Sequence, residues 1–434
     1  MSYCGFITKI KGLRKHTNAD KLQVGQCFGN ETIVGLDVEE GQLGLYLPTD
    51  GRLGLEFATE NKLVRTKDTE GNHLYGYLDP DKLHVSAIKL RGEKSDGLYM
   101  GLTCLEKFTD ISKLKEGDTI TLLNGTLICE KYIPRGNQRR LGGKSQPKDK
   151  INMTSYPNFK EHIDTAQLSY NMHVFKPGDL CQITLKMHGT SQRTSHTIKE
   201  TKKVLPYWVY KALQFLKIEL KPKKKYELVT GTRRVVLKDY NGGFYGDNSF
   251  RRKYHDFFDN KLQKGECIYY EVLGYSHDNQ TIMPECDNKK TKDKEFIKEF
   301  GEKTRFTYGC QEGQNDIYAY RMTITNEDGF TVEYPDHLLK LRCEQMGVKV
   351  CPEFDKFLFT TQEDLMERVN RFLDGADPIG KTHIKEGVVV RIINKERFAV
   401  YKHKSFLFKV LEGLIKADDV LDMEEAENIE DNSI

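Results

Sequence analysis

The stretch Leu180-Cys181-Gln182-Ile183-Thr184-Leu185 runs directly into Lys186-Met187-His188-Gly189-Thr190-Ser191. The first six residues form an apolar run of the length of a buried strand, and Gly189 predicts a tight turn after it. A lysine at this junction presents its amine at the edge of a sheet, within reach of a ligand. Most lysines at strand ends are only solvated, so the segment gains meaning from residues far along the chain.

Two later segments extend the pattern. Glu386 leads into the apolar run Gly387-Val388-Val389-Val390, and Lys402-His403-Lys404 ends the extended run that begins at Phe398. Side chains at i and i+2 of a strand point to the same face. We therefore expect the side chains of Lys402 and Lys404 to share one face of a sheet.

Three more segments lie between Lys186 and Glu386, namely Thr232-Arg233-Arg234, Tyr269-Tyr270-Glu271-Val272-Leu273-Gly274 and Ile317-Tyr318-Ala319-Tyr320-Arg321. In this order the six segments resemble the covalent nucleotidyltransferase superfamily, which contains polynucleotide ligases and RNA capping enzymes. His188 stands where aspartate is commoner and resembles the RNA ligases that seal nicks and edit transcripts. Arg321 replaces an acidic residue that often follows the aromatic position, so Tyr318 stays open beside the preferred Tyr320.

The resemblance implies a role for each residue. Lys186 would be the catalytic nucleophile that carries AMP, with Lys402 and Lys404 as catalytic cations on the phosphate. An amine is nucleophilic only in its neutral form, which nearby cations favour. The residues implied to bind ATP are His188, Gly189, Arg233, Glu271, Tyr320 and Glu386. Glu271 and Glu386 would also provide the oxygen ligands of Mg²⁺ or Mn²⁺.

Composition sets the broad class of protein. At 434 residues, with 38% hydrophobic and 30% charged residues, the chain suits two or three domains. It has no apolar run near the ~18 residues that a membrane-spanning helix needs, and its N-terminus has no secretory signal pattern. Ten cysteines occur singly, without a C-x-x-C pair, which argues against zinc. We expect a cytoplasmic protein, or a nuclear one in a eukaryotic or viral host, not secreted and without a membrane partner.

Charge is unevenly distributed although the net charge is only +3. Basic residues gather between Lys131 and Lys150 and again between Lys199 and Lys225, whereas the last seventeen residues are acidic. Charge separated in this way can hide a polyanion-binding face behind a neutral total. The pattern is consistent with RNA as the partner, although any single cluster is usually just a solvated surface.

Short strands and turn residues dominate the first part of the chain. Lys15–Leu22 and Leu90–Leu98 are similar to signature segments of tRNA-binding OB modules, so we predict an OB-like RNA-binding barrel over residues 1–130. A basic linker over 131–165 follows, then an α+β nucleotidyltransferase domain of antiparallel sheets with flanking helices over 166–412, and an acidic tail over 413–434. The helical spacing of Pro206–Leu220 predicts a helix packed on the core, with Trp208 inside it.

The order of domains selects among family members. Only thirty residues follow Lys404, too few for the OB domain that DNA ligases and capping enzymes carry there. An OB-like module in front resembles the Deinococcus-type RNA ligases. The sequence thus predicts a monomeric, ATP-dependent RNA ligase that joins 3′-hydroxyl and 5′-phosphate ends, at nicks, through lysyl-AMP and an adenylylated polynucleotide. A capping-type guanylyltransferase and a non-catalytic RNA-binding protein with the same fold stay open as alternatives.

Overall fold

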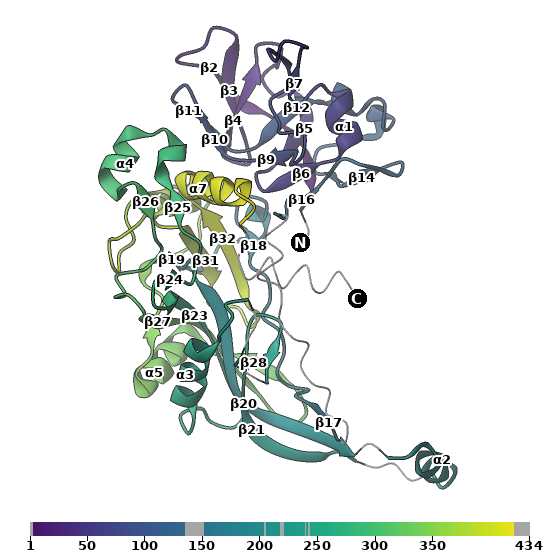
Figure 1. The fold of residues 1–434 in the computed structure, drawn as a ribbon, viewed down its shortest axis with the longest axis vertical. Helices are drawn as coiled ribbons and strands as arrows, with labels where there is room; N and C mark the ends of the chain where they lie inside the picture. The colour runs from purple at the N-terminus through teal and green to yellow at the C-terminus, as the bar shows by residue number, and fades with distance from the viewer. Residues whose placement is uncertain are drawn as a thin grey trace.

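The computed structural model describes residues 3–134, 152–203, 205–217, 221–238, 240–241 and 244–420. Residues 3–134 form an N-terminal module, and residues 152–420 form a larger C-terminal region (Figure 1). Helix α7 (Phe406–Ala417) lies between the two. Among the described residues, no helix is both long enough and apolar enough to cross a membrane.

The N-terminal module consists of short strands, as the turn-rich sequence predicts. Its three main sheets have the orders β12-β5-β1-β13, β2-β3-β4 and β16-β6-β9. The strands are β1 (Gly5–Lys9), β2 (Lys11–Lys15), β3 (Leu22–Cys27), β4 (Asn30–Gly35), β5 (Leu43–Leu47), β6 (Gly51–Leu53), β9 (His84–Val85), β12 (Leu98–Gly101), β13 (Thr119–Ile120) and β16 (Cys129–Lys131). Three hairpins, β7 (Thr66–Lys67) with β8 (His73–Tyr75), β10 (Ile88–Leu90) with β11 (Glu93–Ser95), and β14 (Leu122–Leu123) with β15 (Thr126–Leu127), and helix α1 (Leu55–Glu60) complete the module.

The two segments that resemble OB signatures lie against each other. The Asn18 side chain donates a hydrogen bond to the carbonyl of Arg91 at 2.9 Å, and Nε2 of His16 lies 3.2 Å from the carbonyl oxygen of Leu90. The strand pairings of the described residues form separate sheets and do not close into a barrel. The β-rich module is therefore present, without the closed barrel that the sequence predicted.

The C-terminal region contains two large, mainly antiparallel sheets, which confirms the predicted α+β class. One has the order β22-β21-β20-β23-β27-β28 with β17, β24 and β29 paired to its strands, and the other has the order β18-β32-β31-β19-β30. The first comprises β17 (Asn152–Ser155), β20 (Thr190–Lys203), β21 (Lys223–Gly231), β22 (Val236–Leu237), β23 (Glu266–His277), β24 (Gln280–Thr281), β27 (Asn315–Thr325), β28 (Thr331–Glu333) and β29 (Lys349–Val350). The second comprises β18 (Ala166–Gln167), β19 (Leu180–Lys186), β30 (Glu353–Leu358), β31 (Gly387–Ile392) and β32 (Ala399–Lys404).

Helices supply the apolar cover of both sheets. Aromatic side chains of α3 (Ser249–Phe258) and aliphatic ones of α5 (Asp336–Met346) share one apolar cluster with β23, which is buried along almost all of its length. Helix α6 (Gln362–Leu373) is amphipathic, and its apolar face packs on β19 and β31. The charge-dense segment at 287–300 forms the pair β25 (Cys286–Asp287) and β26 (Lys303–Thr304) and helix α4 (Lys294–Phe300).

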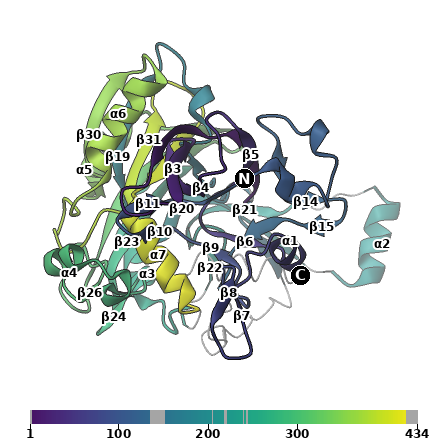
Figure 2. The same cartoon turned by 90° about the horizontal axis from the view of Figure 1, so that it is seen from above.

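Helix α2 (Tyr207–Phe215) contradicts one prediction. We expected it to pack on the core, but it stands at the far end of the β20–β21 hairpin, away from both sheets in two perpendicular views (Figures 1 and 2). Its Trp208 side chain is 74% exposed. Helical spacing of apolar residues predicts an apolar face, and here no core of the described chain covers that face.

Two predicted boundaries can be compared with the elements. Within 131–165, β17 pairs with the end of β20, and the following residues run beside the site described below; most of the basic residues of this segment, from Arg135 to Lys148, lie outside the described residues. Helix α7 continues to Ala417, past the start that we predicted for the acidic tail at 413. Residues 421–434 also lie outside the described residues.

Gly387 is required by the backbone at the start of β31. Its φ is +152°, and a Cβ atom there would lie 2.1 Å from the carbonyl oxygen of His403 on the paired strand. We predict that Gly387→Ala lowers the free energy of unfolding by about 3 kcal/mol or more, because backbone strain adds to a clash with backbone atoms. Denaturant unfolding measures this. Gly117→Ala, with φ +99° but no atom within 4 Å of the new methyl group, is the matched control, and an equal loss in both variants would contradict the role of the clash.

Candidate active site

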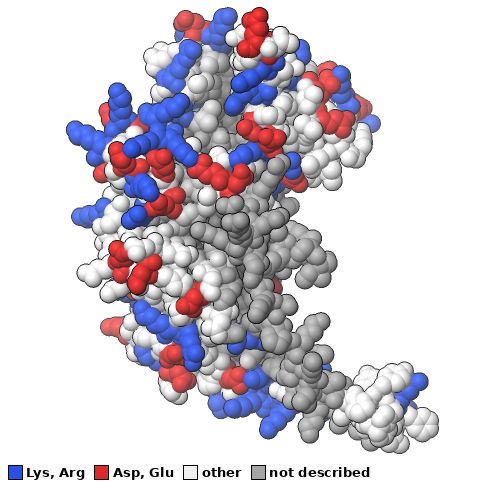
Figure 3. All heavy atoms as spheres, viewed as in Figure 1, with Lys and Arg blue, Asp and Glu red and all other residues white. Residues whose placement is uncertain are grey.

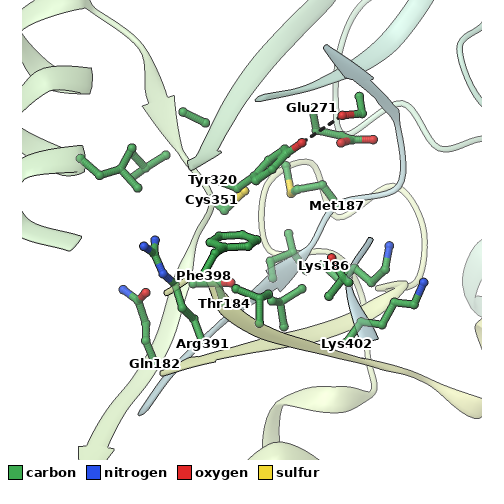
Figure 4. A pocket seen from close by; sticks show the side chains of 18 of the residues that line it. Gln182, Thr184, Lys186, Met187, Glu271, Tyr320, Cys351, Arg391, Phe398 and Lys402 are labelled. Carbon is green, nitrogen blue, oxygen red and sulfur yellow. Dashed lines mark hydrogen bonds between the residues drawn. The ribbon is translucent and has the colours of Figure 1, made fainter. Parts of the chain in front are cut away.

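A cavity opens between the two sheets of the C-terminal region. It has about 1080 Å³ of space not filled by atoms, part of which is continuous with solvent. Lys186, Arg391 and Lys402 line it from the five-stranded sheet, and Glu271 and Tyr320 line it from the nine-stranded sheet (Figure 4). A cavity lined by apolar and aromatic side chains with a few convergent polar groups is typical of a small-molecule site.

Lys186 ends β19 and lies beside a buried carboxylate. Its Nζ is 2.8 Å from Oε2 of Glu386, whose side chain is only 2% exposed. Burial by itself raises the pKa of the Glu386 carboxyl, but Lys186 and Lys404 outweigh burial and hold that pKa below its usual value. Glu386 is therefore an anion that fixes the amine of Lys186 at the cavity.

The two lysines of β32 have different surroundings. Lys402 lines the cavity, whereas Lys404 lies 3.5 Å from Glu386 and 2.8 Å from Glu412 of α7. Burial alone would lower the pKa of Lys404, but Glu412 and Glu386 raise it far above the usual value. Lys404 thus lies between two carboxylates of the protein, and its predicted contact with the phosphate stays a prediction.

Ion pairs continue from Lys404 into the N-terminal module. Glu412 lies 3.4 Å from Lys416, and Lys416 lies 2.5 Å from Asp50 of the module. A second contact joins Lys409 of α7 to Asp96, also at 2.5 Å. Burial raises the pKa of the Glu412 carboxyl, but Lys404 and Lys416 lower it well below its usual value. A chain of alternating charges therefore connects the amine of Lys186 to the module.

His188 and Gly189 lie behind the cavity. The His188 ring stands between Phe306 and Phe408, with ring centroids 4.5 and 4.7 Å away, and burial lowers its pKa to about 4, so the ring is neutral at pH 7. A Cβ atom on Gly189 would lie 2.4 Å from the carbonyl oxygen of Val272. Both residues set the close approach of the turn to β23, and neither lines the cavity.

Tyr320 reaches the cavity because β27 carries a bulge. The register opposite β23 shifts between Tyr269 and Tyr270, which face Arg321 and Ala319 and leave Tyr320 without an opposite residue. A bulge re-aims a side chain in this way. The Tyr320 hydroxyl lies 2.9 Å from Oγ of Ser191, whereas Tyr318 belongs to the apolar core. The structure thus separates the two candidate tyrosines.

Basic residues near the cavity differ in their partners. Arg233 lines the cavity and pairs with Asp164 at 2.7 Å. Arg321, by contrast, is buried, pairs with Glu333 and stacks on Phe398 at 4.3 Å. Arg321 therefore has a structural role. Its positive charge, at a position where an acidic residue was expected, is balanced by the carboxylate of Glu333.

The two glutamates predicted to bind metal occupy different environments. Glu271 lines the cavity, whereas Glu386 forms ion pairs with Lys186 and Lys404. Among the described residues, no three His, Cys, Asp or Glu side chains gather into a metal-binding cluster. Magnesium is commonly held by one or two carboxylates, with substrate phosphates and water completing the shell, so Glu271 by itself fits a cation that arrives with a nucleotide.

Sequence patterns did not reveal several residues of the site. Phe398 and Arg391 line the cavity and were visible only as flanks of the two strand segments; His162, from the predicted linker, lines it beside Tyr320, with ring centroids 5.2 Å apart. Glu412 had no motif at all. Each of these residues depends on contacts between segments that are distant in sequence.

Comparisons with known proteins bear on the fold. No protein-family model matches the chain, and no curated protein matches its sequence. Solved structures of Naegleria gruberi RNA ligase do match. A lysine-to-methionine variant with AMP and Mn has a TM-score of 0.58 at 14% identity, over 93% of this chain and 97% of the other. A glutamate-to-alanine variant with ATP and Mn has 0.57 at 15%, over 93% and 98%, and a complex with PPi has 0.57 at 14%, over 93% and 97%.

The chain has the fold of these RNA ligases. The match spans nearly the whole of both chains, so the N-terminal module is included in it. Both cavity-forming sheets are part of that fold.

We predict that Glu412→Gln lowers the free energy of unfolding by about 1–3 kcal/mol, because it removes the carboxylate that Lys404 and Lys416 share and leaves each lysine with one acidic partner. Denaturant unfolding at neutral pH measures the loss. Glu367→Gln is the matched control, since it removes an exposed helical ion pair with Arg371 and should change stability by less than ~1 kcal/mol. Similar small losses in both variants would contradict the buried chain.

We also predict that His188 makes the fold sensitive to acid. Its pKa of about 4 in the folded state lies below the value of ~6.5 in an unfolded chain. The unfolded state therefore binds the extra proton, and stability falls as the pH drops from 6.5 to 4. His188→Phe should reduce this fall by on the order of 3 kcal/mol, measured by denaturant unfolding across that range. The exposed His73→Phe should leave the fall unchanged, and a parallel fall in His188→Phe would refute the assignment.

Proposed function

We propose that this chain is an ATP-dependent RNA ligase that joins RNA 3′-hydroxyl and 5′-phosphate ends through AMP attached to Lys186. The observation that carries the proposal is the amine of Lys186, held at 2.8 Å by the buried carboxylate of Glu386 at a cavity that Glu271, Tyr320 and Lys402 also line. The fold likeness to RNA ligase structures that contain AMP or ATP with Mn supports the choice of nucleotide and of reaction.

The cavity offers separate groups for base and phosphates. Tyr320 and Phe398 present aromatic faces, which suit a purine ring. Arg233 and Lys402 provide positive charge for phosphate oxygens, and the planar guanidinium of Arg233 can pair with two oxygens at once. Binding a nucleotide phosphate at Arg233 would exchange its contact with Asp164 for a contact with the ligand.

Three group transfers follow from this arrangement. Nζ of Lys186 attacks the α-phosphorus, the bond to the β-phosphate oxygen breaks and pyrophosphate leaves, while Oε2 of Glu386 is placed to accept the proton of the amine. The 5′-phosphate of RNA then attacks the phosphorus, and the P–N bond to Lys186 breaks. Finally the 3′-hydroxyl attacks the activated 5′-phosphate, and AMP leaves.

A divalent cation, Mg²⁺ or Mn²⁺, would neutralise phosphate charge during these transfers. Glu271 is the residue that would hold it, together with oxygens of the bound phosphates. Glu386 instead keeps its place between Lys186 and Lys404.

RNA contact is assigned to the N-terminal module and the basic segment that follows it. Two segments of the module resemble signature segments of tRNA-binding OB modules, and these segments lie side by side. Phosphate contacts release counterions, so end joining should weaken steeply with salt while attachment of AMP to Lys186 should not.

One experiment separates the proposed function from its alternatives. The purified chain is incubated with α-labelled ATP or α-labelled GTP and Mg²⁺, and then with a nicked duplex whose 3′-hydroxyl strand is RNA. Label from ATP on Lys186 and a sealed product are the expected results. Label from GTP alone would indicate a capping-type guanylyltransferase, and absence of label from both would leave an RNA-binding protein that keeps the fold.

We predict that Lys186→Ala removes all protein-bound label, because the phosphorus–nitrogen bond cannot form.

Lys402→Ala should slow labelling by about 10²–10³, as expected for the loss of a preorganised cation on a transferring phosphate. Lys395→Ala is the matched control, since Lys395 pairs with Asp179 outside the cavity at 3.0 Å, and its rate should stay within about twofold. Rapid labelling of Lys402→Ala would remove this lysine from the site.

A further inference from the structure

Helix α2 exposes apolar side chains almost all around its axis. The exposed fractions of Trp208 and Phe215 are 74% and 88%, and Tyr207, Tyr210 and Leu216 are also exposed. Paired residues of β20 and β21, down to Thr201 and Lys223, carry the helix away from the cavity, as Figures 1 and 2 show. Exposed apolar clusters of this kind mark interaction surfaces.

Lysines surround this apolar helix. Between residues 201 and 225 the sequence contains eight lysines and one glutamate. Lys202, Lys211, Lys217 and the run Lys223–Lys225 are exposed among the described residues. In Figure 3, blue side chains gather where the hairpin approaches α2, and the helix itself is mostly white.

We propose that α2 docks the protein on the surface of an anionic membrane. Interfacial helices of this type insert Trp, Phe and Leu at the level of the lipid headgroups while lysines contact anionic lipids. Tyr and Trp are favoured at this depth because their rings are apolar and their polar groups stay hydrated. Nine residues are too few to span a bilayer, so the helix would lie on it.

Charge and chemistry disfavour the other occupants. RNA would attract the lysines and stack on Trp208, but it would not bury the aliphatic side chains of Leu213 and Leu216. A second copy of the chain would bring two lysine-rich hairpins together, and one nine-residue helix offers less than the ~800 Å² per partner of a stable interface. An anionic lipid surface satisfies both the apolar and the basic side chains.

Docking through α2 would leave the cavity accessible. No residue of α2 lines that cavity, and the β20–β21 hairpin separates the two. The ligase would therefore act while held at a membrane surface. This inference does not depend on the proposed ligase reaction, because its test measures binding alone.

Trp208 is the only tryptophan of the chain, so intrinsic tryptophan fluorescence reports on α2 directly. The full chain is titrated with vesicles of phosphatidylcholine alone or with about 30 mol% phosphatidylserine. We expect a blue shift with the anionic vesicles and quenching when their acyl chains are brominated. No shift with anionic vesicles would overturn the proposal, as would a change that only single-stranded RNA or an acidic protein produces.

Two variants that keep Trp208 test the two components. Phe215→Ser with Leu216→Ser should weaken vesicle binding at least tenfold, because it removes apolar area from the helix. Gln in place of Lys223, Lys224 and Lys225 should weaken it about fivefold per lysine. Phe330→Ser, at a phenylalanine outside the hairpin that is 73% exposed, is the matched control and should bind as the parent does.

Stability is measured for every variant by thermal unfolding. The altered side chains of α2 are exposed, so the midpoints should match the parent and a binding loss cannot be attributed to unfolding. Vesicle binding that persists in both hairpin variants would assign the membrane contact to another surface and overturn the proposal.

Discussion

The buried carboxylate of Glu386 is the constraint on which the rest of the site depends. An ionised carboxylate with 2% exposure is stable only when cations and hydrogen bonds replace its water. Lys186 approaches one oxygen and Lys404 the other, and both reach it because β19 and β32 flank β31. The absence of a side chain at Gly387 lets these strands approach at that level. The position of the Lys186 amine therefore follows from the electrostatics of a buried group, and not from the lysine side chain itself.

The ion pairs can extend from Lys186 to the N-terminal module because their charges sum to zero. The chain Lys186, Glu386, Lys404, Glu412, Lys416 and Asp50 contains three cations and three anions, and each internal member contacts an opposite charge on both sides. The neutral ring of His188 fills the space beside it without adding charge. All six segments that resemble the nucleotidyltransferase superfamily lie at or beyond Lys186, outside the N-terminal module. The ion pairs of α7 with Asp50 and Asp96 nevertheless make the module part of the structure that holds the amine.

Features that depend on local sequence pattern could be predicted, whereas features that depend on contacts between distant segments could not. The strand before Lys186 followed from its apolar pattern. The choice of Glu271, Arg233, Lys402 and Tyr320 came from the resemblance to the nucleotidyltransferase superfamily, and all four line the cavity. The partner of Lys404 could not be predicted, because it lies on a helix whose docking is a tertiary contact. The bulge that directs Tyr320 leaves no clear sequence mark. The prediction for helix α2 was wrong for a different reason. Periodicity predicts that one face of a helix is apolar, but it does not tell which surface covers that face.

Lys402 and Lys404 belong to one local sequence pattern but have different surroundings. They share a face of β32, as alternation requires, but β32 ends against α7, so the last lysine meets Glu412 and the earlier one meets the cavity. Lys402 faces the cavity, where a ligand can reach it, whereas Lys404 contacts two carboxylates of the protein. The same strand provides both because its end passes from the cavity into the interface with the N-terminal module. A lysine that lines the cavity and a lysine that begins the ion pairs to the N-terminal module therefore lie within three residues of β32.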